Sequence, residues 1–236
     1  MMDPDFCFHP NDLMRVMGTG QMPCLIDVCV PEDIAAAPWR LPGARHVAHG
    51  DIREWMQTAD PARPVVVICQ KGLKLSHGAA ALLRARGFHA RALEGGNLGW
   101  FDAKRPRLAL NTGSAGIASW VLPAPVTAQS LCLAWLIHRW FDDGAEIMWV
   151  PAAMVGDVAA RFGAQPAPRR IETLCSQAGL DYVPLVTFLS QIDGKAAPWL
   201  PLLTALPHLH HSSEAQAASA LSIIDAAWVA AREGAA

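Results

Sequence analysis

The feature that most constrains the fold is a short apolar run that ends in a cysteine and leads directly into a helix-forming stretch. The run Val65-Val66-Val67-Ile68 is rich in β-branched residues, which predicts a strand buried on both faces of a parallel sheet. The Ala/Leu-rich segment 79–85 predicts a helix. Cys69 therefore lies at a strand-to-helix corner, where backbone N–H groups and a helix N-terminus stabilise a thiolate or a bound anion.

Residues 1–104 alternate strand and helix patterns. The proline-bounded apolar run 24–28 predicts a second buried strand. Asp51 is expected to cap a short helix over 52–56, and Gly87 is expected to end the helix that follows Cys69. This alternation predicts an α/β domain whose parallel sheet is flanked by helices.

The pattern changes beyond this first domain. Residues 105–119 combine basic, proline and small residues without hydrophobic periodicity, which predicts a linker. Residues 120–236 predict a mainly α second domain, with a strand over 146–150 and a capping-box pattern that opens at Ser213. Helical spacing places one apolar stripe on Leu133, Leu136, Ile137, Trp140 and Phe141.

Composition excludes several classes of protein. The net charge of −2 and the pI near 6.5 give no argument for binding nucleic acid or an anionic membrane. No apolar stretch reaches the roughly 18 residues of a membrane span, and the acidic start lacks a signal-peptide pattern, so we expect a cytoplasmic protein. The six cysteines form no CxxC pair, which favours reduced thiols over disulfides or a structural zinc site.

The first domain resembles the rhodanese family across nearly its full length. The phrases that carry the resemblance are residues 25–28 with 31–32, then 41–47, 65–72 and 93–100. The resemblance implies a rhodanese α/β fold in which Cys69 accepts a sulfane sulfur as a persulfide and passes it to a thiophilic acceptor. It also implies that Asp27 is a structural acid near the active-site loop. No cofactor is expected.

The residues after Cys69 suit this chemistry. The candidate binding loop comprises Gln70, Lys71, Gly72, Leu73, Lys74, Leu75 and Ser76. Thiosulfate-type donors are anions, so the attacking thiolate must lie in a positive concavity, and the resemblance implies that backbone N–H groups supply it. Lys71 and Lys74 would add steering, and the equally weighted alternative is that both lysines are merely solvated. The expected partners are a small anionic sulfur donor and a thiol acceptor, and no oligomeric state is predicted.

The length of the loop favours larger oxyanions. Seven residues, Cys69 to Leu75, precede Ser76. This is one more than in common sulfurtransferase members and is similar to the cell-cycle phosphatases and arsenate reductases built on the rhodanese fold. A wider cradle suits phosphate, arsenate or chromate. The loop ends in Leu75 without the arginine that clamps a phosphoryl group, so phosphatase activity is not expected.

Cys29 stands where the family often has arginine. One interpretation is that it resolves a Cys69 persulfide or sulfenate as a disulfide, and the favoured one is a packing residue at the strand end. Chromate reduction through Cys69 and Cys29 is a further hypothesis.

Residues 120–236 resemble, more faintly, the C-terminal domain of chromate-resistance proteins, which in some bacteria follows a rhodanese domain. The matching text is residues 120–121, 135–142, 145–146 and 223–228. The stretch that is usually charged in the family is replaced here by the uncharged residues 127–130, and the family's Cys-Pro pair is replaced by Leu133-Ala134. A ligand site built on the family's residues would therefore be missing. The resemblance adds chromate as a candidate ligand. Non-catalytic binding or sensing of such an oxyanion is the alternative function.

The tract His208–His211 is dense in histidine. Imidazoles bind transition metals, but the tract lacks the spaced partners of a closed metal site and is followed by two serines. A surface loop is the favoured interpretation, and no metal site is expected.

Overall fold

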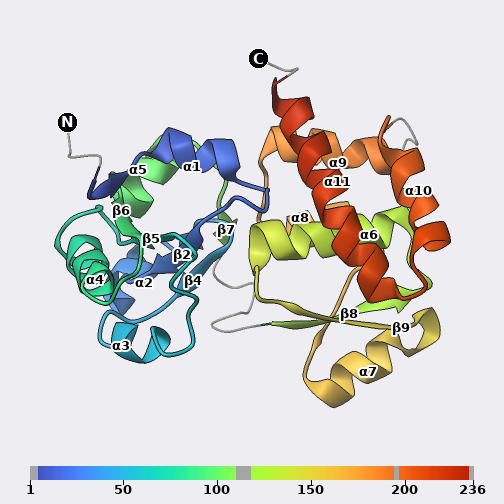
Figure 1. Ribbon diagram of the computed structural model, residues 1–236, viewed down its shortest axis with the longest axis horizontal. Coiled ribbons are helices and arrows are strands. Elements are labelled where there is room, and N and C mark those ends of the chain that lie inside the picture. Colours follow the sequence, from blue (N-terminus) through green and yellow to red (C-terminus); the bar gives the residue numbers. More distant parts are fainter. Residues whose placement is uncertain (1–4, 110–117, 194–196, 234–236) are drawn as a thin grey trace. The chain divides into compact units, whose positions relative to one another are not determined.

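The computed structural model describes residues 5–109, 118–193 and 197–233, and the chain divides into two compact units (Figure 1). Unit 1 comprises residues 1–17 and 21–116, and unit 2 comprises residues 18–20 and 117–236. Within the expected linker, residues 110–117 lie outside the described residues.

Unit 1 is an α/β structure built on one parallel sheet. Five strands pair in the order β1-β6-β5-β2-β4, and β3 pairs antiparallel with β7. The strands are β1 (Cys7–Phe8), β2 (Cys24–Asp27), β3 (Trp39–Arg40), β4 (Ala44–His46), β5 (Val65–Ile68), β6 (Ala90–Leu93) and β7 (Leu108–Ala109). The helices are α1 (Pro10–Val16), α2 (Pro31–Ala36), α3 (Ile52–Trp55), α4 (Lys74–Arg84) and α5 (Gly96–Asp102). The predicted parallel sheet flanked by helices is confirmed.

The central strand β5 is covered on both faces. All four of its residues are buried. Val65 and Val67 belong to a core cluster with Leu83 of α4, against which Ile34 of α2 and Trp55 of α3 also pack. Helices α1 and α5 lie together on one side of the sheet, with α2, α3 and α4 on the other (Figure 1). The uninterrupted apolar run of β5 follows from this two-sided burial.

Two predicted helix starts differ in detail. Helix α4 begins at Lys74, earlier than the Ala-rich segment suggests, because the His77 N–H donates to the Leu73 carbonyl oxygen over 3.0 Å and closes an additional turn. Asp51 occupies the N-cap of α3, but its side chain makes no capping hydrogen bond.

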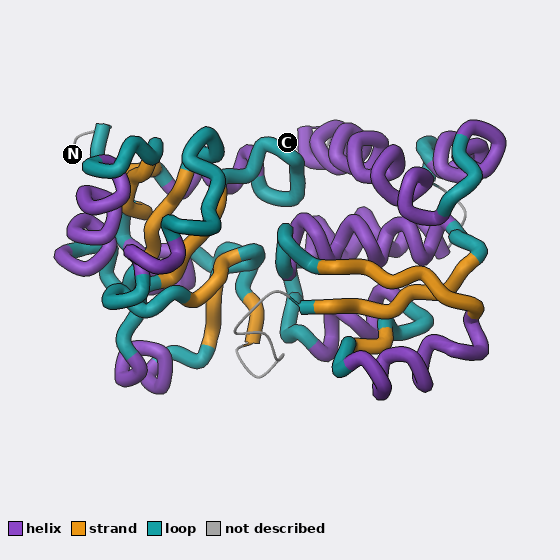
Figure 2. Tube along the Cα trace, turned by 60° about the horizontal axis from the view of Figure 1, so that its bottom comes forward, coloured by secondary structure: helices purple, strands orange, loops and turns teal. Residues whose placement is uncertain are grey.

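Unit 2 joins helices to a small parallel sheet in the order β10-β8-β9. Helix α7 lies along one side of this sheet and α6 along the other (Figure 1), and the β8 and β9 strands run side by side in Figure 2. The strands are β8 (Ser119–Ala124), β9 (Glu146–Pro151) and β10 (Gln165–Pro166). The helical segments are α6 (Ala128–Leu136), η2 (Ile137–Phe141), η3 (Ala152–Met154), α7 (Val155–Phe162), α8 (Ile171–Gln177), α9 (Val183–Asp193), α10 (Leu200–Leu209) and α11 (Ser213–Glu233). The helix-rich second part of the chain is confirmed.

The α6 helix forms the centre of unit 2. Every residue of the predicted apolar stripe along α6 and η2 is buried. The Asp225 carboxylate of α11 accepts hydrogen bonds from Trp135 Nε1 at 2.7 Å and from Arg139 Nε and Nη2 at 3.0 and 2.9 Å. These charge-assisted bonds fix α11 against α6 and η2. The α11 cap differs from the prediction, because Ser212 and not Ser213 accepts the capping bond, from Ala215 N.

Among the described residues, no helix of either unit is long and apolar enough to cross a membrane.

Candidate active site

Cys69 follows the last residue of β5 and faces the beginning of α4. Its side chain is buried, with 4% of its surface exposed. Cys69 Sγ donates to Ser76 Oγ over 3.1 Å, and the Ser76 hydroxyl donates to the Leu73 carbonyl oxygen over 3.1 Å. If the thiol loses its proton, the Ser76 hydroxyl can turn and donate to the sulfur, which would stabilise the thiolate.

The loop that follows Cys69 carries several backbone N–H groups without an acceptor among the described residues. Within the part of the chain that the structure describes, the N–H groups of residues 70–73 donate to no protein acceptor. The first N–H groups of α4, from Lys74 to Ser76, have no acceptor inside the helix, because no helical carbonyl precedes them by one turn. A run of unsatisfied donors at a helix N-terminus is an arrangement that binds anions.

The turn between β6 and α5 holds the Cys69 loop in place. Asn97 N donates to the Cys69 carbonyl oxygen over 3.0 Å, and Leu98 N donates to the Gln70 carbonyl oxygen over 2.9 Å. Gly72 and Gly96 allow the two segments to approach, since both have positive φ and a Cβ on either would overlap the facing backbone. The loop is therefore rigidly positioned by contacts distant in sequence.

Asp27, the expected structural acid, ends β2 beneath this loop. Its Oδ1 accepts from Cys29 N at 2.9 Å and its Oδ2 accepts from Asn97 Nδ2 at 3.0 Å. Because Asn97 also binds the Cys69 carbonyl oxygen through its backbone N–H, the buried carboxylate connects to Cys69 through one residue. Asn97 was not singled out from the sequence, where a residue after two turn glycines gives little sign of such a role.

The Cys29 thiol lies in the same buried network. Asn97 Nδ2 donates to Cys29 Sγ over 3.3 Å. Burial raises the pKa of this thiol, and the nearby Asp27 carboxylate raises it further, well above its ordinary value. Cys29 therefore stays protonated at neutral pH and does not offer a second thiolate beside Cys69.

A cavity of about 440 Å³ opens over Cys69. Its lining comprises Asp33, Cys69, Gln70, Lys71, Leu73, Lys74 and Leu75. The structure thus brings together most of the candidate loop, while Gly72 and Ser76 lie buried behind it. Asp33, in the first turn of α2, was missed by sequence reasoning because nothing in its local pattern distinguishes it from an ordinary helix-start acid.

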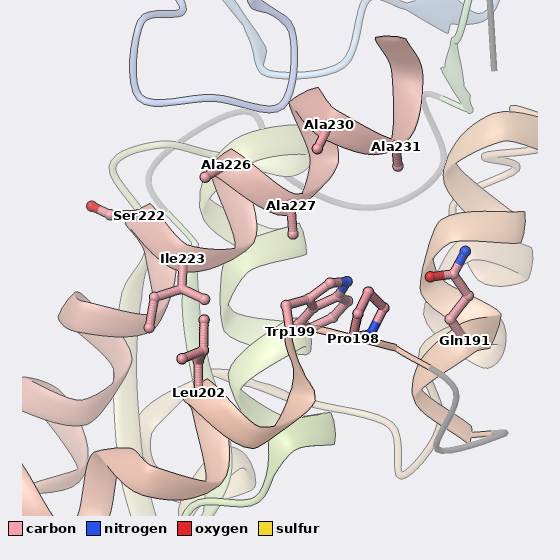
Figure 3. A pocket seen from close by; sticks show the side chains of 10 residues that line it. All are labelled: Gln191, Pro198, Trp199, Leu202, Ser222, Ile223, Ala226, Ala227, Ala230 and Ala231. Atoms are coloured by element: carbon pink, nitrogen blue, oxygen red, sulfur yellow. The ribbon is translucent and has the colours of Figure 1, made fainter. Parts of the chain in front are cut away.

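A second and larger pocket, of about 1060 Å³, lies among α9, α10 and α11 of unit 2 (Figure 3). The side chains that line it are Gln191, Pro198, Trp199, Leu202, Ser222, Ile223, Ala226, Ala227, Ala230 and Ala231. None of these is charged, so this pocket offers none of the chemistry of the Cys69 site.

The described residues contain no group of three or more His, Cys, Asp or Glu side chains that could hold a metal ion. In the histidine tract, His210 Nε2 instead lies 2.8 Å from Ser219 Oγ, and the His210 carbonyl oxygen accepts from Gln216 Nε2 at 2.8 Å. His210 therefore helps to attach the end of α10 to α11.

Unit 1 is thus of the class of α/β structures in which a cysteine follows a central parallel strand and opens a loop whose N–H groups lack acceptors in the described part of the chain. Comparisons with known proteins specify the class further. Residues 9–103 match the rhodanese-like domain family. The chain is 35% identical over 83 residues to a protein of Bacillus subtilis named "Putative sulfurtransferase YtwF", covering 35% of this chain and 78% of that protein.

Solved structures of other proteins are also similar to part of the chain. A rhodanese-related protein from Thermoplasma volcanium has 20% identity and a TM-score of 0.38, with 44% of this chain and 98% of that one covered. A rhodanese homologue from the extremely thermophilic bacterium Thermus thermophilus has 34% identity and a TM-score of 0.30, with 39% and 95% covered.

The chain belongs to the rhodanese family through its first unit. The family match and the Bacillus relative support an activity of the sulfurtransferase type. The chromate-resistance resemblance of residues 120–236 stays a prediction.

Proposed function

We propose that this protein is a sulfurtransferase that moves sulfane sulfur from thiosulfate-type donors through a persulfide on Cys69. The observation that carries the proposal is that Cys69 lines a cavity together with loop residues whose N–H groups have no acceptor in the described residues and with the first residues of α4. This environment stabilises both the attacking thiolate and an anionic donor.

In the loading step the Cys69 thiolate attacks the outer, sulfane sulfur of thiosulfate. A bond forms between Cys69 Sγ and that sulfur while the sulfur–sulfur bond of the donor breaks. The electron pair of the broken bond leaves with sulfite. The N–H groups of residues 70–75 and the Lys71 and Lys74 ammonium groups would stabilise the sulfite as charge builds on it.

In the unloading step a nucleophilic acceptor, cyanide or a thiolate, attacks the outer sulfur of the persulfide. The Sγ–S bond breaks and its electron pair returns to Cys69 Sγ as a thiolate, which the Ser76 hydroxyl can stabilise. No electrons are gained or lost overall, so the cycle needs no cofactor. It does need a reduced Cys69, which favours a cytoplasmic setting.

Chromate and other tetrahedral oxyanions are the second candidate ligands. The same N–H groups would bind such an ion without turnover, and the loop of seven residues gives room for it. Under this alternative the protein binds or senses an oxyanion, with chromate stress as the physiological setting that the second domain suggests.

The test of the leading proposal is the Cys69→Ser protein, assayed for sulfur transfer from thiosulfate to cyanide. We expect turnover to fall to background, because a serine hydroxyl cannot form the persulfide. Cys24→Ser is the matched control, since Cys24 is a half-buried thiol of the same sheet that does not line the cavity. Unchanged turnover in Cys69→Ser would disprove the proposal.

Alkylation separates the proposal from the oxyanion-binding alternative. Iodoacetamide should label Cys69 near neutral pH, and thiosulfate should replace the free thiol by a persulfide of higher mass. Protection from alkylation by chromate, in a protein that shows no sulfur transfer, would favour the binding function.

A further inference from the structure

One residue that lines the cavity over Cys69 is acidic, and sulfur loading does not use its carboxylate. Asp33 lines this cavity together with Lys71 and Lys74. Its side chain is half-buried, and within the described residues it forms an ion pair with neither lysine. A carboxylate repels thiosulfate and every other anionic donor, so anion binding does not account for an acidic residue in this lining.

The size of the cavity also exceeds the needs of the inorganic donor. At about 440 Å³ it has the volume of roughly fifteen water molecules, taking ~30 Å³ for each, and lies within the range of sites for organic ligands. Leu73, half of whose surface is exposed, and Leu75 add apolar lining. Room and apolar contact are therefore available for an organic molecule.

The charges of the lining are arranged for a ligand that is not a simple anion. The N–H groups and the α4 N-terminus attract a negatively charged group of the ligand toward Cys69. Asp33, which lies on α2, attracts a positively charged group. A molecule with a nucleophilic anionic sulfur and an ammonium group satisfies both. Neutral thiols would leave Asp33 unused, and anionic thiols would be repelled by it.

We propose that the sulfur acceptor is an organic thiol that carries an ammonium group, and that Asp33 binds this ammonium. The inference rests on the proposed sulfurtransferase function and adds the acceptor class. The acceptor's thiolate attacks the outer sulfur of the Cys69 persulfide, the Sγ–S bond breaks, and its electron pair stays on Cys69 Sγ. The product is the persulfide of the amino thiol, and the acceptor's own thiol proton has gone to solvent before the attack.

Asp33 is on this account a specificity-determining residue. Three thiols of similar size and different charge test it: cysteamine, 2-mercaptoethanol and 3-mercaptopropionate. For each, kcat/KM for unloading the thiosulfate-loaded full-length enzyme is measured at one pH and low salt. We expect Asp33→Asn to lower the kcat/KM ratio of cysteamine to 2-mercaptoethanol about five- to tenfold, the size of one partly exposed charge-assisted contact. The same variant should raise the kcat/KM ratio of 3-mercaptopropionate to 2-mercaptoethanol.

Two further variants test whether the charge of Asp33 and its position at the cavity are responsible. Asp33→Glu retains the negative charge and should preserve more than half of the cysteamine preference. Glu32→Gln removes the exposed neighbouring carboxylate, which does not line the cavity, and should leave the ratio at the parental value. Because each ratio compares two thiols on one protein, a general loss of activity or stability cancels.

The outcomes separate this inference from the proposed function. If the parent transfers no sulfur to cyanide, the sulfurtransferase proposal fails. If cyanide turnover is present but Asp33→Asn leaves the cysteamine ratio unchanged, or Glu32→Gln lowers it equally, the inference about Asp33 alone is overturned.

Discussion

Cys29 and Cys69 follow the ends of two neighbouring strands, β2 and β5, yet their surroundings differ. Burial raises the pKa of the Cys29 thiol far above normal, and the Asp27 carboxylate beside it raises the pKa further. Cys69 lies beside a hydroxyl and the positive end of α4. The same residue type is therefore kept protonated at one position, and at the other it lies where the proposed function needs a nucleophile.

This contrast predicts that Cys29 takes no part in sulfur transfer. Cys29→Ala should keep thiosulfate-to-cyanide turnover within about threefold of the parent, because the variant loses one weak contact from Asn97 and leaves Asn97 bound to Asp27. Mass spectrometry after iodoacetamide at pH 7.5 should find the label on Cys69 and not on Cys29. A correctly folded Cys29→Ala protein that transfers no sulfur would instead indicate a resolving role, and chromate reduction through both thiols would regain support.

At the level of elements, the site depends on how closely the β5–α4 loop approaches the β6–α5 turn. Gly72 has φ of +65°, and a Cβ there would lie 2.5 Å from the Leu93 carbonyl oxygen. That distance is shorter than any van der Waals contact, so a side chain must push the loop away from the turn. The N–H groups of residues 70–73, which have no acceptor among the residues that the structure describes, would move with the loop.

Gly72→Ala should therefore abolish sulfur transfer and destabilise unit 1 by about 2 kcal/mol or more, from the strained φ and the overlap together. Gly78→Ala is the matched control, since it lies in α4 and its added Cβ meets nothing within 4 Å. That change should stabilise the helix by about 0.5–1 kcal/mol and retain activity. Urea unfolding and the cyanide assay measure both effects. Equal behaviour of the two variants would show that the close approach is unimportant.

The elements that sequence reasoning found and those it missed differ in how local their signals are. The β5 run and the α6 stripe were predicted because burial is visible in the local sequence, as a continuous apolar run in β5 and as helical spacing of apolar residues in α6. Asn97 and Asp33 were missed because their roles arise from chain segments far apart in sequence. Strand β8 was missed because its apolar residues follow directly on a linker-like segment, and its partners are β9 and β10 much later in the chain.

Across the whole molecule, buried thiols in both units affect how stability depends on pH. All six cysteines lie in the described residues and no disulfide joins them. Burial raises the pKa of Cys29 in unit 1 and of Cys132 in unit 2, and it raises the pKa of Cys175 to about 11, with Glu172 contributing. Each of these thiols must lose its proton at a lower pH in the unfolded chain than in the folded one.

Alkaline pH should consequently destabilise the protein through these thiols. Above the unfolded-state pKa near 9, the unfolded chain binds fewer protons than the folded one, so the free energy of unfolding falls as pH rises, until the folded thiol itself titrates. For Cys175 this window runs from about pH 9 to about 11, and the loss by pH 10.5 is at most about 2 kcal/mol.

Cys175→Ala isolates this contribution. Removing the buried sulfur lowers stability at pH 8 by about 1 kcal/mol, but the variant should then lose less between pH 8 and pH 10.5 than the parent does. Urea unfolding followed by tryptophan fluorescence measures the free energy of unfolding of the parent and the variant at pH 8 and at pH 10.5. Groups common to both proteins, such as Tyr182, titrate equally and cancel from the comparison. A variant that loses as much stability over this interval as the parent would show that the Cys175 thiol is not held protonated by the fold.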